Sequence, residues 1–261
     1  MQVELVQFLL FLGACFVILL IVWRRRPETK IQTSEWHVRW ALGVIGLTGT
    51  MIFQYIAFDI GPITEVNIIA YSWPLIAALI MIFGRTAENS KQLIILSLLG
   101  FGGVLLLIGG DKLGQQWQIP SPLGVLFAVL SAVCMAAFSF GMTRTQSHAD
   151  DVLLPGALVG LAIAAVWCLF GNTPWNLSWT LWAGLYLGVG PMGLGYLFWA
   201  LAMQRDSSGK AALFGFLTPV LSTVLLLASG QNLTLTSSIG AVIVLITCAL
   251  ASKQAWISRY A

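Results

Sequence analysis

The sequence predicts an all-α polytopic membrane protein, a helix bundle of nine transmembrane helices arranged as two inverted-topology repeats. Composition, the spacing of apolar segments and the placement of basic residues lead to this prediction. Of the 261 residues, 58% are hydrophobic and only 9% are charged, whereas soluble domains carry about 25% charged residues. The mean hydropathy is +0.89. Most of the protein surface is therefore expected to face lipid.

Nine apolar segments follow one another with short connections that carry turn residues such as Gly61-Pro62 and Ser121-Pro122. Each segment is long enough to cross about 30 Å of hydrocarbon as a helix. Each must be helical, because lipid offers no hydrogen-bond partner to the backbone. The predicted spans are 4–23, 38–59, 63–84, 92–110, 121–142, 152–171, 178–203, 210–229 and 236–252.

The basic residues predict the orientation of the bundle in the membrane. All but one of the 13 lysines and arginines lie in or beside alternate loops, and the exception is Lys112. Because cytoplasmic loops are enriched in these residues, the C-terminus is predicted to be cytoplasmic, and with nine spans the N-terminus is outside. The expected location is a bacterial plasma (inner) membrane. The modest net charge of +3 gives no reason to expect nucleic acid as a partner.

An internal repeat is the next prediction. Aligning Pro74 with Pro219 also pairs Phe53 with Phe198 and Ala57 with Ala202. The Pro74 segment would run inward and the Pro219 segment outward, so the two halves are inverted, as in many secondary transporters. The predicted division is a first repeat of four helices at 1–110, an external linker at 111–120, a second repeat of five helices at 121–253 and a cytoplasmic tail at 254–261.

Prolines inside three predicted spans mark expected helix kinks, at Pro74, Pro191 and Pro219. A proline within a helix removes one backbone hydrogen bond and bends the helix. Paired interruptions in the two halves of a transporter point to a binding site near the middle of the membrane. An ordinary kinked bundle is the alternative explanation.

Several stretches resemble the drug/metabolite transporter superfamily, EamA type. They are 53–58, 65–67, 71–74, 100–110, 195–201 and 214–220. The Glu65-Val66 and Tyr71-Ser72-Trp73-Pro74 stretches are most similar to its aromatic amino-acid exporter branch. The resemblance implies two EamA-like repeats of five helices each, a central substrate cavity, and export of amino acids or other metabolites.

Aromatic and uncharged polar residues near the two repeat prolines are the candidate substrate-binding residues. Asn67 and Tyr71 share a helix face, as do Phe214 and Thr218, because residues four apart lie on one side of a helix. A cavity rich in aromatic faces suits an amphipathic or aromatic solute. The full candidate set is Gln54, Tyr55, Glu65, Asn67, Tyr71, Trp73, Tyr196, Trp199, Phe214 and Thr218. For the aromatic members, lipid contact or bundle packing is the alternative.

Charged residues give little support for metal or acid–base chemistry. Glu65 is the only acid close to a span interior. It is expected either to be stabilised at a helix N-terminus by the helix dipole, or to recognise a substrate ammonium or take part in a proton step. His148, Asp150 and Asp151 lie together in a predicted cytoplasmic loop without a further ligand at metal-site spacing. We predict no metal, no cofactor and no catalytic residue.

The predicted function is therefore a secondary transporter that exports amino acids, aromatic ones among them, or similar small metabolites by alternating access. Its partners are a small-molecule substrate and the lipid bilayer. Two alternatives come from other classes. An integral membrane enzyme would need a reactive cluster near the interface, and a non-transporting assembly subunit would need a stable partner.

One helix is expected to be missing from the first half. The second repeat has five spans and the first has four, so nothing pairs with 121–142. We therefore expect either that Met1 is an internal start or that the chain is a truncated relative of a ten-span form. Such a chain would leave one side of the cavity open to lipid and would expose faces that need a neighbouring helix.

Overall fold

The structure is a computed structural model that describes residues 3–25, 36–84, 89–112, 118, 120–171, 179–206, 209–230 and 233–260. Within these ranges every regular element is helical. Eight helices are long and apolar enough to cross a membrane, so the predicted all-α polytopic membrane bundle is confirmed. They are Val3–Arg24, Trp36–Ile60, Ile63–Phe83, Ser90–Gly109, Pro122–Met142, Ala149–Phe170, Leu181–Gln204 and Leu235–Ser252.

The ninth predicted span, 210–229, is divided in the structure. It begins as a 3-10 helix, η5 (Ala211–Phe216), and continues as the α-helix α11 (Leu217–Ala228). The Pro74 segment is also divided, into α4 (Ile63–Ala70) and α5 (Trp73–Phe83). Each proline lies in the first turn of a new helix, where its missing N–H costs little. The chain is therefore interrupted just before Pro74 and Pro219 rather than kinked at the prolines themselves.

Two other spans contain π-helices. The segment η2 (Val44–Gly49) joins α2 (Trp36–Gly43) to α3 (Thr50–Ile60). The segment η4 (Gly188–Gly195) joins α9 (Trp179–Leu187) to α10 (Tyr196–Gln204) and contains Pro191. π-Helical turns are rare and frequent at functional sites. They occur here in the two spans that our repeat alignment pairs, which supports the repeat assignment.

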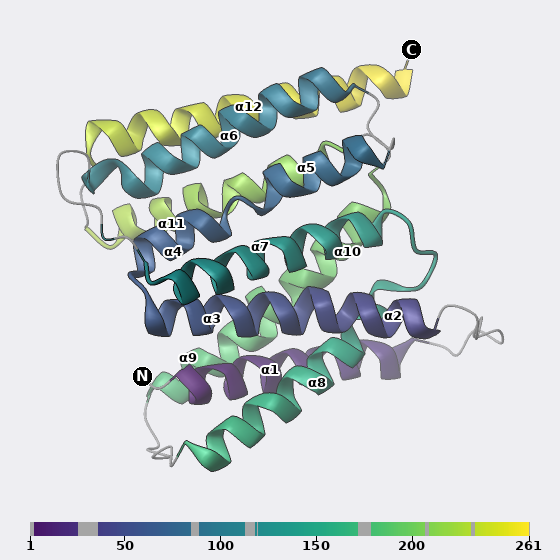
Figure 1. Cartoon of the computed structure of the whole chain (residues 1–261). Coiled ribbons are helices and arrows are strands. Elements are labelled where there is room, and N and C mark those ends of the chain that lie inside the picture. Colours follow the sequence, from purple (N-terminus) through teal and green to yellow (C-terminus); the bar gives the residue numbers. More distant parts are fainter. Residues whose placement is uncertain are drawn as a thin grey trace.

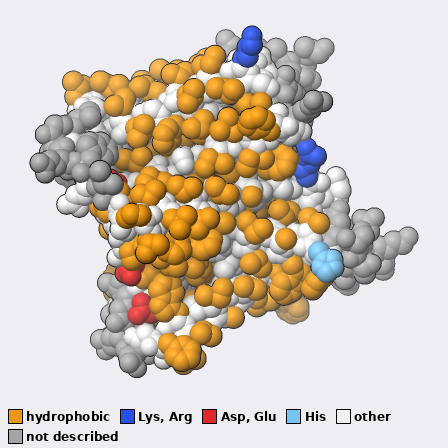
Figure 2. All heavy atoms as spheres, in the orientation of Figure 1, with side chains coloured by type: hydrophobic (Ala, Val, Ile, Leu, Met, Phe, Trp, Pro, Cys, Tyr) orange, Lys and Arg blue, Asp and Glu red, His pale blue; other side chains and the backbone are white. Residues whose placement is uncertain are grey.

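The helices lie roughly parallel and pack side by side (Figure 1). At one edge α6 (Ser90–Gly109) packs against α12 (Leu235–Tyr260), and at the other α1 (Val3–Arg24) packs against α8 (Ala149–Phe170). Apolar side chains cover the middle of the visible face, and the charged side chains seen there lie toward the helix ends (Figure 2). This distribution fits a bundle that spans a bilayer.

Glycines let some backbones approach very closely. A side chain at Gly43 of α2 would meet the backbone of α8 at Val152, and one at Gly156 of α8 would meet the backbone of Gly43. A Cβ at Gly13 of α1 would lie 2.7 Å from the carbonyl oxygen of Leu185. Small residues let helices associate in a membrane, where the hydrophobic effect does not drive them together, so these contacts hold α2 against α8 and α1 against α9.

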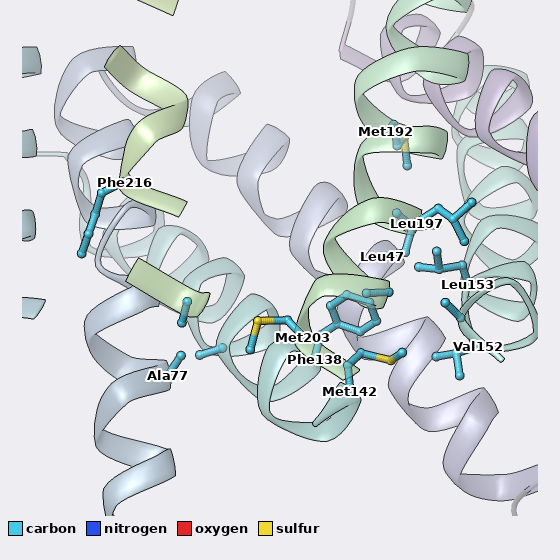
Figure 3. Close-up of a cluster of buried hydrophobic side chains, with 14 of the residues drawn as sticks. Leu47, Ala77, Phe138, Met142, Val152, Leu153, Met192, Leu197, Met203 and Phe216 are labelled. Carbon is cyan, nitrogen blue, oxygen red and sulfur yellow. The ribbon is translucent and has the colours of Figure 1, made fainter. Parts of the chain in front are cut away.

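One part of the packed core lies at the predicted cytoplasmic ends of α7, α8 and α10. Phe138 and Met142, on α7 (Pro122–Met142), lie near Met203 of α10 (Figure 3). Val152 and Leu153 of α8 lie beside them, and all five side chains are fully buried. The predicted cytoplasmic half of the bundle is therefore closed by side-chain packing.

The helix α7, which has no counterpart in our repeat alignment, packs against α3, α4 and α5 (Figure 1). Among the described elements, none occupies the corresponding place between α10 and α11. The predicted repeat boundaries and the expected missing helix remain predictions. Most of the predicted 111–120 linker lies outside the described residues.

Candidate functional site

A cavity of about 530 Å³ lies among the four interrupted spans and α7. Its walls come from the middles of helices. They are Thr50, Gln54, Ala70, Tyr71, Trp73, Ser131, Ala132, Met135, Pro191, Gly195, Tyr196, Trp199, Phe214, Gly215, Leu217, Thr218 and Leu221. The two helix breaks and the two π-helices either contribute residues to this cavity or end next to a residue that does. The irregular segments of the backbone therefore all lie around the same cavity.

Most of the candidate residues predicted from the sequence line this cavity. They are Gln54, Tyr71, Trp73, Tyr196, Trp199, Phe214 and Thr218, together with Pro191. Pro74 and Pro219 directly follow the lining residues Trp73 and Thr218 in the sequence, but they do not line the cavity themselves. Whether the lining binds substrate stays a prediction.

Two tryptophans from different halves of the chain form one end of the cavity. The rings of Trp73 and Trp199 meet edge to face, with their centroids 5.2 Å apart and an interplanar angle of 86°. The Trp199 indole N–H donates to Ser139 Oγ at 3.0 Å. The Trp73 ring fills the space beside Gly215 that a larger side chain would need. Edge-to-face packing and one hydrogen bond thus fix an apolar floor.

The cavity ends at this floor on the predicted cytoplasmic side. Its lining stops at Trp73, Met135 and Trp199, although the three helices continue to Phe83, Met142 and Gln204. Beyond the floor lie the buried side chains of the packed core described above. The structure therefore represents a state in which the cavity is closed toward the predicted cytoplasm.

The polar groups of the cavity are uncharged. No Asp, Glu, Lys, Arg or His is among its lining residues, whereas Gln54, Thr218 and the tyrosines Tyr71 and Tyr196 are. An uncharged apolar lining with a few polar groups suits a solute whose own charges cancel and whose larger part is apolar.

Glu65, a candidate for ammonium recognition, lies away from the cavity. Its side chain is only 6% exposed, and both carboxylate oxygens accept from Lys112 Nζ, at 2.8 and 3.0 Å. The backbone N–H of Gln118 donates to Glu65 Oε1 at 3.2 Å. The carboxylate is thus occupied by an ion pair that joins the start of α4 to the end of η3 (Gly110–Lys112).

Two further candidates lie outside the lining. The Tyr55 ring packs edge to face against Phe58 on the same helix, with centroids 5.8 Å apart. Asn67 lies half-buried on α4, one turn before Tyr71. The structure does not bring either residue to the cavity wall.

The acidic pair Asp150–Asp151 takes part in an ion-pair cluster. Arg25 contacts Asp150 at 2.9 Å and Asp151 at 2.6 Å, and Arg39 lies 4.0 Å from Asp151. These contacts join the ends of α1, α2 and α8 at the predicted cytoplasmic side. Within the described ranges, no group of three or more His, Cys, Asp or Glu side chains is arranged to hold a metal ion.

Sequence reasoning missed several lining residues, notably Thr50, Ser131 and Met135. Thr50 precedes the candidate Gln54 by four residues, so the face-sharing rule applied to the other candidates would have found it. Ser131 and Met135 belong to α7, whose proline, Pro122, lies at the start of the helix rather than in the middle of the span, so the search near mid-span prolines did not reach them.

Comparison with known proteins gives a family match and several relatives. Residues 122–253 match the model of the EamA-like transporter family. The aromatic amino acid exporter YddG of Ancylobacter novellus is 28% identical over 203 residues, which cover 77% of this chain and 70% of that protein. The uncharacterized transporter YyaM of Bacillus subtilis is 25% identical, with 84% and 74% covered.

More distant matches extend over similar lengths. Solute carrier family 35 member G1 of Mus musculus is 23% identical, and the match covers 82% of this chain and 61% of that protein. One solved crystal structure aligns with 97% of this chain and 89% of its own, with a TM-score of 0.83 and 25% sequence identity. The whole bundle, and not only its second half, therefore has known counterparts.

Proposed function

Because the chain belongs to the EamA-like transporter family, we propose that it is a secondary transporter that exports amino acids, aromatic ones among them, or similar small metabolites. The observation that carries this proposal is the uncharged, aromatic-walled cavity at the middle of the bundle. Its wall is built from both halves of the chain, as a site that opens alternately to the two sides requires. The relative named as an aromatic amino acid exporter supports the same substrate class.

The cavity suits a zwitterion with an aromatic side chain. Such a solute has no net charge, so it needs no charged partner in the wall. Its ring can stack on the Trp73 and Trp199 faces, and its ammonium is attracted by aromatic faces within about 6 Å. A cavity of about 530 Å³ lies within the range of about 300–1,000 Å³ usual for small-molecule sites.

In alternating access, the floor at Trp73 and Trp199 would act as the gate toward the predicted cytoplasm. Opening would separate the two rings and break the hydrogen bond from Trp199 to Ser139. The glycines and helix breaks beside the cavity give the backbone places to bend during this movement.

The test is transport by the 261-residue chain in proteoliposomes loaded with labelled L-phenylalanine. Replacing Trp73 or Trp199 by alanine should lower the transport rate at least about tenfold, because the floor loses its aromatic contacts. Trp182→Ala is the matched control, because Trp182 is 70% exposed and lies outside the cavity. Trp199→Phe keeps the ring and serves where the alanine variant does not fold.

Saturable flux that persists unchanged when Tyr71, Trp73 and Trp199 are all alanine would rule out this site. Absence of flux for every amino acid tested, with a stable protein partner that co-purifies, would favour the non-transporting subunit.

A further inference from the structure

We propose that the hydroxyl groups of Thr50 and Tyr196 form a polar subsite that binds the carboxylate of the transported solute. The subsite rests on the proposed function, since it names how that cavity would hold an amino acid. Thr50 is a lining residue that the sequence did not suggest. Its side chain is 6% exposed, and its Oγ1 is buried without a hydrogen-bond partner among the described residues.

The two hydroxyls belong to residues that occupy the same place relative to the two π-helices. Thr50 is the first residue after the π-helix η2, and Tyr196 is the first residue after the π-helix η4. Each donates its backbone N–H three residues back, to the carbonyl oxygens of Leu47 and Gly193. Both residues line the cavity. The two π-helices thus end on facing residues at the same cavity.

The pair is close but not satisfied. The Tyr196 hydroxyl lies near that of Thr50, yet the two do not reach ordinary hydrogen-bond geometry, and Thr50 Oγ1 stays unpaired. A buried polar group without a partner lowers the stability of the fold. A solute group that hydrogen-bonds both hydroxyls would remove that cost, so binding is favoured at this position.

The surrounding groups favour an acceptor rather than an ammonium as the ligand. The Thr50 backbone carbonyl already accepts from Ser131 Oγ at 2.9 Å. No lining residue carries a carboxylate. The hydroxyl groups of Thr50, Tyr71 and Tyr196 can each donate one hydrogen bond. A carboxylate accepts from several donors at once, and its charge is balanced within a zwitterion.

The arrangement assigns the two parts of an aromatic amino acid to neighbouring parts of the cavity wall, since Tyr196 lies one helical turn before Trp199 on α10. The ring would lie toward the Trp73–Trp199 floor, and the carboxylate at Thr50 and Tyr196. Because no arginine or lysine is among the lining residues, the carboxylate is held by neutral donors alone. Binding of this kind is selective without being tight, which suits a solute that must be released.

The experiment measures competition against labelled L-phenylalanine bound to the purified full chain in nanodiscs. The competitors are unlabelled L-phenylalanine, 3-phenylpropionate, which keeps the carboxylate, and phenethylamine, which lacks it. Thr50→Val removes the hydroxyl at nearly constant shape, and Thr50→Ser restores it. Thr247→Val on α12 is the matched control, because Thr247 is also buried but bonds only the Ile243 carbonyl of its own helix, at 2.9 Å.

In Thr50→Val the inhibition constants of L-phenylalanine and 3-phenylpropionate should rise about tenfold, as expected for loss of a hydrogen bond to a charged group. That of phenethylamine should change less than about twofold, and Thr50→Ser and Thr247→Val should resemble the wild type. An equal rise for phenethylamine, or no rise for any competitor, would overturn the subsite. If the proposed function is wrong, the wild-type chain will bind no amino acid, which is a different result from an unchanged Thr50→Val variant. If the wild-type chain also binds neither 3-phenylpropionate nor phenethylamine, both proposals are wrong.

Discussion

The two seams that flank the cavity are built alike and covered differently. In the first half, α7 packs along α3, α4 and α5. In the second half, the corresponding seam between α10 and α11 has no helix laid over it among the described elements. On α5 four residues are buried, Pro74, Ala77, Ala78 and Met81, whereas on α11 the side chains of Leu221, Val224 and Leu225 are 63%, 55% and 70% exposed.

A covering helix closes the seam and packs against its small residues. Where α7 covers the seam, a serine hydrogen-bonds from one helix to the next, glycines pack against side chains, and the cavity wall is closed. Where none is present, small and polar residues such as Gly190, Gly195 and Thr218 lie open. Small and hydroxyl-bearing residues are typical of helix interfaces in membranes. The open seam therefore keeps the character of a helix interface.

The largest expected effect comes from one glycine in each π-helix. A Cβ at Gly46 would run into the ring of Phe138, which is fully buried and has no room to move, whereas a Cβ at Gly190 would meet nothing within 4 Å. Gly46→Ala should lower the free energy of unfolding by about 1–3 kcal/mol. Gly190→Ala should not lower it. Unfolding in mixed detergent micelles measures both, and equal losses would show that the two seams are packed alike.

A smaller difference is expected for one serine on each seam. Ser131 on α7 donates across the closed seam to the Thr50 carbonyl at 2.9 Å, whereas Ser222 on α11 donates to Thr218 of its own helix at 3.1 Å. Ser131→Ala should cost about 1 kcal/mol of unfolding free energy. Ser222→Ala should cost less than about half of that, because its exposed hydroxyl joins no second helix. A larger loss at Ser222 would contradict the comparison.

The smallest effect is expected on the open seam itself. Leu225→Ala should change the unfolding free energy by less than about 0.5 kcal/mol, as is usual for exposed positions. Leu98→Ala on α6, where the side chain is 54% exposed, is the control of similar exposure. A loss well above that control, in native membranes or in micelles, would reveal a neighbour that covers α11 in the assembled protein.

Much of the fold followed from the sequence because membrane constraints are strong. Apolar length predicted the spans, and the two prolines marked the irregular ones, although the predicted kinks are changes of helix just before Pro74 and Pro219. The resemblance in 53–58, 71–74 and 195–201 predicted the EamA type, and the family match to 122–253 confirms it. The aromatic exporter branch is likewise supported by the similarity to YddG of Ancylobacter novellus.

The candidate site was harder to predict where it depends on contacts between distant segments. Glu65 drew attention as an isolated acid, but its partner Lys112 lies 47 residues away in the sequence and was not paired with it. Thr50 was missed because the face-sharing rule was not applied to Gln54, four residues further along the helix. Tyr71, Trp73, Tyr196 and Trp199 were found because they are aromatic and lie near the repeat prolines or in an aromatic-rich span.

The most direct test of the central claim, that the solute occupies the cavity between the two seams, is substrate protection of a cysteine placed in its wall. In a background without the four native cysteines, Gln54→Cys lines the cavity and Asp59→Cys lies exposed on the same helix, one turn beyond. We predict that saturating L-phenylalanine slows alkylation by a water-soluble maleimide severalfold at position 54 and leaves position 59 unchanged. Saturable transport without protection at position 54, or equal slowing at both positions, would contradict the account.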